Sequence, residues 1–215
     1  MKVAMILAAG RGERLKPITC FIPKALCLVQ GKPLIEHHII NLAKAGFDPI
    51  IINHAYLGAQ LRHYLGNGRK WGVRLIYSPE PPGGLETGGG IFNALALLGN
   101  APFLVVNADN YTSYDFNHIH LPKDSLAHMV LGPKPEYYSH YDYGLLGQKL
   151  TNNERKYTNL GIVYYHPQAF SHAQPGRYSV TPLIRQLADA HCVSAELFDG
   201  QWIDVGTLER LKAVM

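Results

Sequence analysis

Basic side chains gather in one loop near the start of the chain. The loop that follows the apolar run of residues 3–8 carries Arg11, Arg14, Lys16 and Lys24. Gly10 and Gly12 in the same loop lack side chains, so backbone N–H groups can approach a phosphate closely. Holding guanidinium and ammonium groups together is unfavourable unless a multiply charged anion offsets their repulsion. The segment therefore predicts an anion-binding site.

Two other phosphate-binding loops do not match this segment. A dinucleotide-binding loop would need a third glycine where Leu15 stands, and an acidic residue closing a strand about twenty residues later. A Walker A loop would need Gly-Lys-Ser/Thr at a spacing that does not occur after Gly10. Both alternatives are therefore excluded on their spacing.

Two carboxylates stand at the ends of strand-like runs. Asp109 ends the segment FLVVNAD, and Asp204 ends the segment WID. In open α/β sheets, ligands bind beyond the carboxyl ends of the strands. Two carboxylates beside a basic loop form a set that Mg²⁺ prefers when phosphate oxygens and water complete its coordination. Either aspartate alone is at least as typical of a turn or helix cap, so the Mg²⁺ prediction depends on the combination.

The elements that must position these residues alternate between strands and helices. Strand-like runs cover residues 3–8, 49–53, 73–77, 103–107, 127–131 and 160–165. Such alternation predicts an α/β fold with a mixed, mostly parallel central sheet flanked by helices. An apolar period of three to four residues predicts a helix with Pro33 in its first turn and Gly46 as its stop. With the first two strands it forms a right-handed βαβ unit.

Two further segments are less regular. Residues 78–90, SPEPPGGLETGGG, predict a dense turn that precedes a helix over residues 91–98. Four tyrosines crowd the polar stretch of residues 137–143. That stretch is either a lid over a ligand or a loop held by aromatic packing, and the sequence leaves both possibilities open.

Composition excludes several classes of protein. The 215 residues, 47% of them hydrophobic, can bury one sizeable core, and a net charge of +4 is too small to indicate nucleic-acid binding. Three cysteines without a CxxC pair argue against disulfides and a cysteine zinc site, and the histidines lack helical zinc spacing. No signal peptide or membrane span is apparent. We therefore expect a cytoplasmic protein without nucleic-acid or membrane partners.

Motifs in one order along almost the whole chain resemble those of the sugar nucleotidyltransferases. They are LAAGRGERLKP (7–17), PK (23–24), SPEPPGGLETGGG (78–90), VNAD (106–109), YGLL (143–146) and WIDVGT (202–207). These enzymes join a sugar 1-phosphate to a nucleoside triphosphate and release pyrophosphate. The resemblance implies one Rossmann-like domain of the GT-A type over residues 1–215, with a nucleotide-binding part over about 1–110 and a sugar-binding part over about 111–215. No C-terminal β-helix is expected.

Within that family, three segments are most similar to bacterial uridylyltransferases that act on N-acetylmuramate 1-phosphate in cell-wall recycling. They are INHAYLG (52–58), LETGGGIF (85–92) and APFLVVNAD (101–109). The similarity implies UTP and this sugar phosphate as substrates, Mg²⁺ as cofactor, and a monomer or small homo-oligomer. A related sugar or choline phosphate enzyme using GTP, dTTP or CTP, and a non-catalytic nucleotide-binding module, remain as alternatives.

The resemblance also implies residue roles. Catalysis would fall to Arg14 and Lys24, and metal binding to Asp109 and Asp204. The nucleotide would contact Ala8, Ala9, Gly10, Gly12, Glu13, Arg14, Lys24, Glu80, Leu85, Glu86, Gly88 and Asn107. The sugar would contact Tyr143, Gly144, Thr158 and Asn159. Two positions depart from the family pattern, since Ala108 replaces a common glycine and Leu160 replaces a small residue expected near the sugar.

Overall fold

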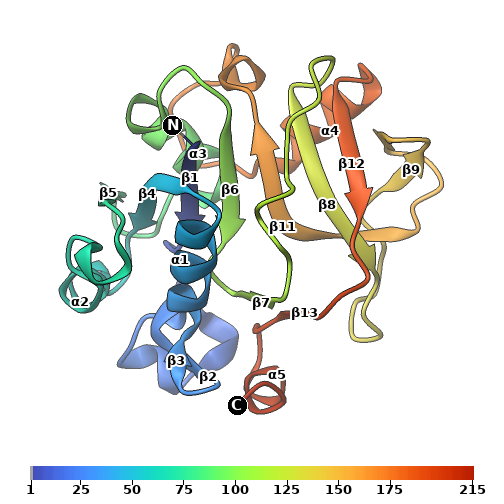
Figure 1. The fold of residues 1–215 in the computed structure, drawn as a ribbon. Helices are drawn as coiled ribbons and strands as arrows, with labels where there is room; N and C mark the ends of the chain where they lie inside the picture. Colours follow the sequence, from blue (N-terminus) through green and yellow to red (C-terminus); the bar gives the residue numbers. More distant parts are fainter. Residues whose placement is uncertain (1) are drawn as a thin grey trace.

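A nine-stranded sheet runs through the computed structural model, which describes residues 2–215 (Figure 1). Its strand order is β5-β4-β1-β6-β11-β8-β12-β10-β9. The strands are β1 (Lys2–Leu7), β4 (Phe47–His54), β5 (Leu75–Pro79), β6 (Phe103–Asn107), β8 (Ala127–Pro133), β9 (Gly144–Leu146), β10 (Lys149–Thr151), β11 (Tyr157–Tyr165) and β12 (Val193–Leu197). The helices are α1 (Leu34–Lys44), α2 (Gly58–Leu65), α3 (Glu86–Leu98), α4 (Thr181–Asp189) and α5 (Leu208–Lys212).

The sheet is mixed, as predicted. β5, β4, β1 and β6 run parallel to one another. β11 is antiparallel to both β6 and β8, whereas β12 is parallel to β8. Because β1, β4 and β6 point the same way, their carboxyl ends meet at one edge of the sheet.

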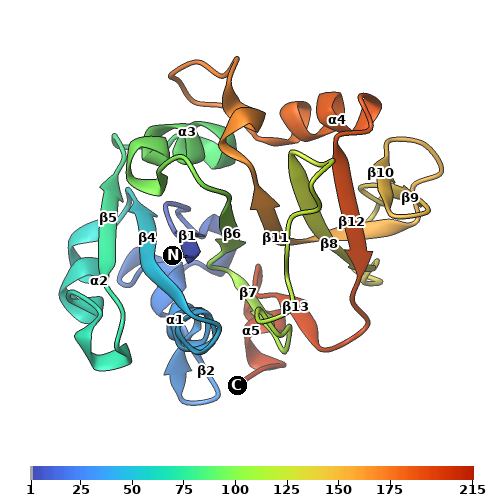
Figure 2. The ribbon, with the colours of Figure 1, turned by 45° about the horizontal axis from the view of Figure 1, so that its top comes forward.

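Both faces of the sheet are buried, as the apolar runs of its central strands require. Along β1, Ala4 and Ile6 belong to one core cluster while Val3 and Met5 belong to the other, which is the two-residue alternation of a strand. Helices α1 and α2 pack in the first cluster, and α3 and α4 in the second. Figure 2 shows α3 and α4 along the top of the view, with α1 and α2 below.

The helix predicted between Pro33 and Gly46 is present as α1. Pro33 occupies its N-cap position, and Gly46 follows the C-cap with a φ of 79°, a conformation that glycine adopts without strain. The helix predicted over residues 91–98 begins earlier, at Glu86. The dense-turn prediction was therefore wrong for residues 86–90, because tertiary contacts of the glycines override their low helix propensity.

Two small sheets lie beside the main one. β2 (Leu28–Val29) pairs with β3 (Lys32–Pro33), and β7 (Asn110–Thr112) pairs with β13 (Trp202–Asp204). Figure 1 shows β7 and β13 below the sheet, between α1 and α5. Within residues 2–215, no helix combines the length and apolar character needed to cross a bilayer.

Candidate active site

A first cavity of about 410 Å³ opens at the carboxyl ends of β1 and β6. Its volume is typical of small-molecule sites, which measure roughly 300–1,000 Å³. Its lining comprises Leu7, Ala8, Ala9, Gly10, Arg11, Glu13, Lys24, Ala25, Asn53, Gly83, Gly84, Glu86, Thr87, Asn107, Ala108, Asp109 and Arg177. The basic loop and the ends of two strands therefore face one space, as their positions in the sequence predicted.

A buried amide holds two walls of the first cavity together. Asn53 at the end of β4 accepts a hydrogen bond from the backbone N–H of Ala8 at 2.7 Å. Its Nδ2 donates to Glu80 Oε1 at 2.6 Å, and Glu80 Oε2 accepts from the N–H of Leu85 at 2.7 Å. Both carboxylate oxygens of Glu80 thus accept hydrogen bonds from the protein itself. Neither Glu80 nor Leu85 lines the first cavity.

The glycines at the start of α3 serve the protein's own packing. A Cβ on Gly88 would lie 2.5 Å from the ring of Tyr178, and one on Gly89 would lie 2.0 Å from the carbonyl oxygen of Gly176. The N–H groups of Gly88 and Gly89 both donate to the carbonyl of Tyr178, at 2.9 and 3.1 Å. The segment before α4 therefore occupies these N–H groups, so the nucleotide contact predicted at Gly88 cannot be made through its N–H.

Gly12 allows the basic loop to fold back on itself. Its φ is 66°, and a Cβ there would lie 2.8 Å from Thr19 Cγ2 and 3.0 Å from Lys24 Cβ. Thr19 Oγ1 donates to the carbonyl of Gly12 at 2.8 Å. A side chain at Gly12 would push the loop away from Lys24. Gly12 therefore does not line the cavity itself, but it allows Lys24 to do so.

One ammonium group contacts both predicted metal ligands. Lys24 Nζ lies 2.7 Å from Asp109 Oδ2 and 4.0 Å from Asp204 Oδ1. The Lys24 side chain is 11% exposed and that of Asp204 is 9% exposed, so these charges interact in a weakly hydrated place. The two aspartates, far apart in the sequence, therefore share one site.

The pairing of β7 with β13 brings the two carboxylates together. Asp204 lies opposite Asn110 in this antiparallel ladder, and the N–H of Val205 donates to the carbonyl of Asp109 at 2.9 Å. Asn110 also donates from Nδ2 to the carbonyl of Leu160 at 2.6 Å, which ties the ladder to β11. The site thus depends on a two-stranded sheet too short to show a period in the sequence.

Asp204 has partners that the sequence did not reveal. Arg210 Nη1 donates to Asp204 Oδ2 at 2.6 Å, and the hydroxyl of Tyr138 donates to the same oxygen at 2.9 Å. Arg14 Nη2 is 3.9 Å from that oxygen. A Cβ on Gly206 would lie only 2.8 Å from Arg14 Nη2, so this glycine leaves room for the guanidinium. Arg210 and Tyr138 therefore orient the Asp204 carboxylate by hydrogen bonds to its Oδ2.

The chemistry of this pair fits a divalent cation. Asp204 Oδ1 is buried and has no hydrogen-bond partner among residues 2–215. An unpaired buried acceptor is unfavourable, and a bound cation would satisfy it. Mg²⁺ commonly takes one or two carboxylates and completes its coordination with phosphate oxygens and water. Asp109 and Asp204 are therefore the side chains that could hold such an ion.

A buried histidine supports the same region from beneath. His38 on α1 is 2% exposed, and its Nε2 lies 2.7 Å from the carbonyl oxygen of Asn110. Burial lowers the pKa of His38 to about 4, so the ring is neutral near pH 7 and its Nε2–H donates to that carbonyl. His38 therefore fixes the backbone next to Asp109 without adding charge.

A second cavity of about 420 Å³ has two partners of Asp204, Arg14 and Tyr138, in its wall. Its lining comprises Arg14, Tyr137, Tyr138, Ser139, His140, Asp142, Tyr143, Asn159, Thr181 and Arg185. Asp204 contacts Arg14 of this cavity and Lys24 of the first, so it links the walls of the two cavities. If one molecule bound in each cavity, reacting groups of both molecules could lie beside the charges of Lys24, Arg14 and Asp204.

The tyrosine-rich segment packs and lines a cavity at once. The rings of Tyr137 and Tyr138 meet edge to face at 5.1 Å, and Tyr138 meets Trp202 at 6.4 Å. The guanidinium of Arg210 lies 4.4 Å from the ring centre of Tyr137. Aromatic packing thus holds this loop, as one of the two possibilities predicted, and its residues line the second cavity. A role as a lid over a ligand stays a prediction.

The structure divides the predicted site residues by position. The first cavity is lined by Ala8, Ala9, Gly10, Glu13, Lys24, Glu86, Asn107 and Asp109. The second is lined by Arg14, Tyr143 and Asn159. Neither cavity is lined by Gly12, Glu80, Leu85, Gly88, Gly144, Thr158 or Asp204.

Three expectations about the sugar side need correction. A Cβ on Gly144 would lie 2.2 Å from the carbonyl oxygen of Asn153, so this glycine faces the protein. Thr158 is fully buried, and Leu160 is 1% exposed in the core cluster of α1 and α2. Leu160 therefore does not stand at a sugar site, and its size is explained by core packing.

Functional residues that the sequence did not single out share one property. Asn53, Arg177, Arg185 and Arg210 each border a cavity or a carboxylate, yet none belongs to a glycine-rich or strand-end acidic motif. Asn53 could have been found, because like Asn107 it is a polar residue at the end of an apolar run. The arginines give no such signal.

Comparisons with known proteins agree with this geometry. A family model described as nucleotidyl transferase matches residues 3–215. The chain is 44% identical to the N-acetylmuramate alpha-1-phosphate uridylyltransferase of Neisseria meningitidis serogroup B, over 97% of this chain and 95% of the relative. It is 31% identical to the protein of the same name from Caulobacter vibrioides, over 95% and 92% of the two chains.

Solved structures share the fold. A UDP-glucose pyrophosphorylase in complex with UDP-glucose aligns with a TM-score of 0.80 at 22% identity, over 100% of this chain and 97% of the other. The inositol-1-phosphate CTP transferase of T. maritima aligns with a TM-score of 0.77 at 15% identity, over 98% and 91% of the chains. These similarities establish the α/β architecture with its mixed sheet.

Proposed function

The chain belongs to the nucleotidyl transferase family, and we propose that it joins UTP to N-acetylmuramate 1-phosphate, producing UDP-N-acetylmuramate and pyrophosphate. The observation that carries the proposal is the convergence of Lys24, Asp109 and Asp204, with Asp204 in contact with a residue of each cavity. The substrate pair is that named for the relatives from Neisseria meningitidis and Caulobacter vibrioides. The reaction would serve the reuse of cell-wall sugars in the cytoplasm.

The first cavity suits the nucleotide. Its backbone-rich wall at Ala8, Ala9 and Gly10 admits phosphates closely, because no long side chain stands there. Glu86 and Thr87 line the same space at the start of α3 and would border the base. Asn107, at the end of β6, would hold the ribose or a phosphate.

The second cavity suits the sugar 1-phosphate. Its lining includes Arg14, which lies beside Asp204 and would receive the phosphate end of the acceptor. Asn159 and Tyr143 line the same space and would face the sugar. With one substrate in each cavity, the acceptor phosphate and the nucleotide would meet beside Lys24.

The reaction needs positioned positive charge more than a nucleophilic side chain. An oxygen of the sugar phosphate would form a bond to the α-phosphorus while the bond from that phosphorus to the bridging oxygen of pyrophosphate breaks. Lys24 and Arg14 would neutralise the charge that develops on the α-phosphate and on the leaving group. Asp109 and Asp204 would hold Mg²⁺, which when bound supplies further neutralisation of phosphate charge.

A substrate panel tests this proposal. Purified protein with Mg²⁺ is offered UTP, dTTP, CTP and GTP, each with N-acetylmuramate 1-phosphate, N-acetylglucosamine 1-phosphate, glucose 1-phosphate, mannose 1-phosphate or phosphocholine. Pyrophosphate release is followed, and the nucleotide sugar is identified by mass spectrometry. We expect the highest kcat/KM for UTP with N-acetylmuramate 1-phosphate. Binding of UTP without turnover of any acceptor would indicate a non-catalytic module instead.

A further inference from the structure

The second cavity contains a cation that the transfer chemistry does not use. We infer that Arg185 binds a carboxylate on the acceptor sugar and thereby selects an acidic sugar phosphate over its neutral counterpart. The inference rests on the proposed function, in which this cavity receives the acceptor. It adds a specificity-determining residue to a site whose reacting groups are Lys24, Arg14 and the two aspartates.

Arg185 stands in the wall of the second cavity. It lies one helical turn after Thr181 on α4, so both side chains project from the same face of the helix, and both line the second cavity. Its positive charge acts on the hydroxyl of Tyr143, a residue that is 2% exposed. Burial raises the pKa of Tyr143 to about 12, so its hydroxyl is neutral near pH 7 and does not offset the charge of Arg185.

The charge of Arg185 is not neutralised by the protein. Within residues 2–215 its guanidinium forms no ion pair with a carboxylate, although Asp142 lines the same cavity. Asp142 Oδ2 instead accepts the backbone N–H of Asn159 at 2.9 Å, and Asp142 Oδ1 lies 3.9 Å from His140. A cation facing a cavity without its own counter-ion favours an anionic ligand group.

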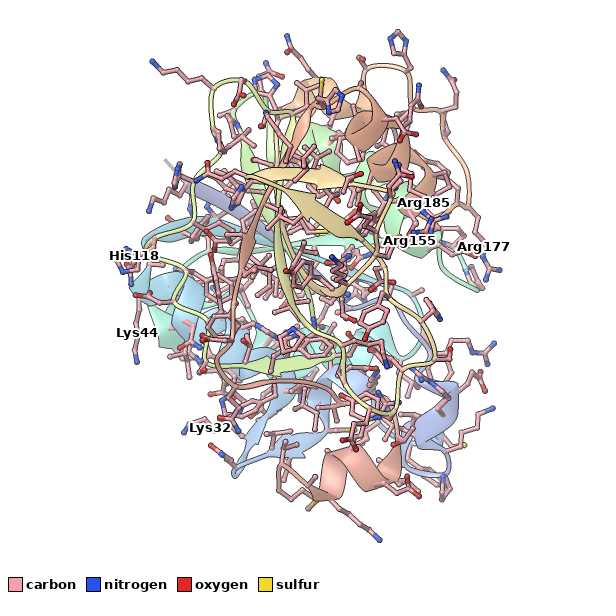
Figure 3. All side chains as sticks on the ribbon, turned by 90° about the vertical axis from the view of Figure 1, so that its right-hand side faces the viewer. Lys32, Lys44, His118, Arg155, Arg177 and Arg185 are labelled. Carbon is pink, nitrogen blue, oxygen red and sulfur yellow. The ribbon has the colours of Figure 1, made fainter. Side chains whose placement is uncertain are left out.

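A second arginine reinforces this potential. Arg155 also acts electrostatically on Tyr143, and its Nε donates to the carbonyl of Asn152 at 3.0 Å. Figure 3 shows Arg155 and Arg185 close together in the upper half of the view, whereas α5 lies at the bottom. Arg185 lines the second cavity together with Arg14, the residue proposed to receive the acceptor phosphate. An acceptor with its phosphate at Arg14 would therefore present a second anionic group to Arg185, while Arg155 adds positive potential from outside the cavity lining.

The acceptor proposed above carries the matching group. N-acetylmuramate differs from N-acetylglucosamine only by a lactyl ether at O3 that ends in a carboxylate. The two sugar 1-phosphates are otherwise identical in structure. A guanidinium presents parallel N–H groups that match a carboxylate in two hydrogen bonds. A site built for a polar group discriminates strongly against a ligand that lacks it.

The test compares two acceptors across variants with UTP and Mg²⁺ held constant. In Arg185→Gln, kcat/KM for N-acetylmuramate 1-phosphate should fall about 10- to 100-fold, the range for a lost charge-assisted hydrogen bond. The value for N-acetylglucosamine 1-phosphate and the KM for UTP should stay unchanged. Arg185→Lys should recover part of the loss. Lys44→Gln, at the other side of the molecule in Figure 3, is the matched control and should change nothing.

A modified acceptor separates a direct contact from a structural effect. The lactyl amide of N-acetylmuramate 1-phosphate should be a poorer substrate of the unaltered enzyme by a similar factor. In Arg185→Gln the amide and the acid should differ little, because the interaction has already been lost. Equal losses for acid, amide and N-acetylglucosamine 1-phosphate would overturn the inference while leaving the proposed function standing. Absence of turnover by the unaltered enzyme would instead overturn the proposed function.

Discussion

Replacement of Lys24 by methionine tests the charge cluster most directly. Methionine keeps much of the unbranched apolar stem and removes the ammonium that contacts Asp109 at 2.7 Å and Asp204 at 4.0 Å. In the proposed reaction this ammonium stabilises charge on the phosphates, and loss of one such group lowers kcat by about 10²- to 10³-fold. The KM for UTP should change less.

The effect on stability should be smaller and should depend on metal. A hydrogen bond between charged groups contributes about 1.5–3 kcal/mol. The Asp109 side chain is 37% exposed, so water screens its attraction to Lys24. We therefore expect the metal-free variant to lose about 1 kcal/mol, which corresponds to a Tm lower by about 2–4 °C for a chain of this size. Mg²⁺ should stabilise the variant more than the unaltered protein, because no ammonium competes for the carboxylates.

Steady-state pyrophosphate release and thermal unfolding with and without Mg²⁺ measure both effects. Lys70→Met is the matched control, because Lys70 also faces a carboxylate, that of Glu36 at 3.9 Å, but lies outside both cavities. Lys24→Arg keeps the charge and guards against a folding defect. Unchanged kcat in a folded Lys24→Met protein, or a Mg²⁺ effect equal to that of the control, would refute the reasoning.

The remaining predictions concern the support of the site. Arg210→Gln should raise the Mg²⁺ concentration for half-maximal activity about 10-fold, since partners of metal ligands tune affinity, with Lys212→Gln as the control in kinetic titrations. Gly89→Ala places a Cβ 2.0 Å from a backbone oxygen, and urea denaturation should show a loss of about 2–4 kcal/mol. Gly10→Ala meets no atom within 4 Å, so stability should persist while the KM for UTP rises. Because burial holds the pKa of His38 near 4, stability should fall as pH drops from about 6.5 toward about 4, by at most about 3 kcal/mol; an equal slope in His38→Gln would contradict this.

Local patterns predicted the elements that carry the site. The run that ends at Asn107 was predicted with its observed bounds, and the helix between Pro33 and Gly46 was found where its apolar period placed it. Such patterns are readable because near neighbours in sequence determine the alternation of a strand and the period of a helix. The placement of Asp109 at a sheet edge follows from the same reasoning.

Contacts between distant segments were less readable. The glycines at 88 and 89 suggested a turn, and Gly88 a nucleotide contact, yet they make room for Tyr178 and Gly176. Leu160 suggested a change in sugar binding, yet it belongs to the core. In each case a remote segment explains the residue type. The sequence alone could not distinguish that reason from a role in ligand binding.

The sequence by itself determined the α/β class, the basic loop and the two carboxylates, because these depend on composition and on short periods along the chain. Only the tertiary structure decided that Lys24 lies against both carboxylates and that Arg210 and Tyr138 orient one of them. The short ladder of β7 and β13 creates these contacts. Such a ladder is stabilised by the packing around it, so its few residues carry no signal of their own.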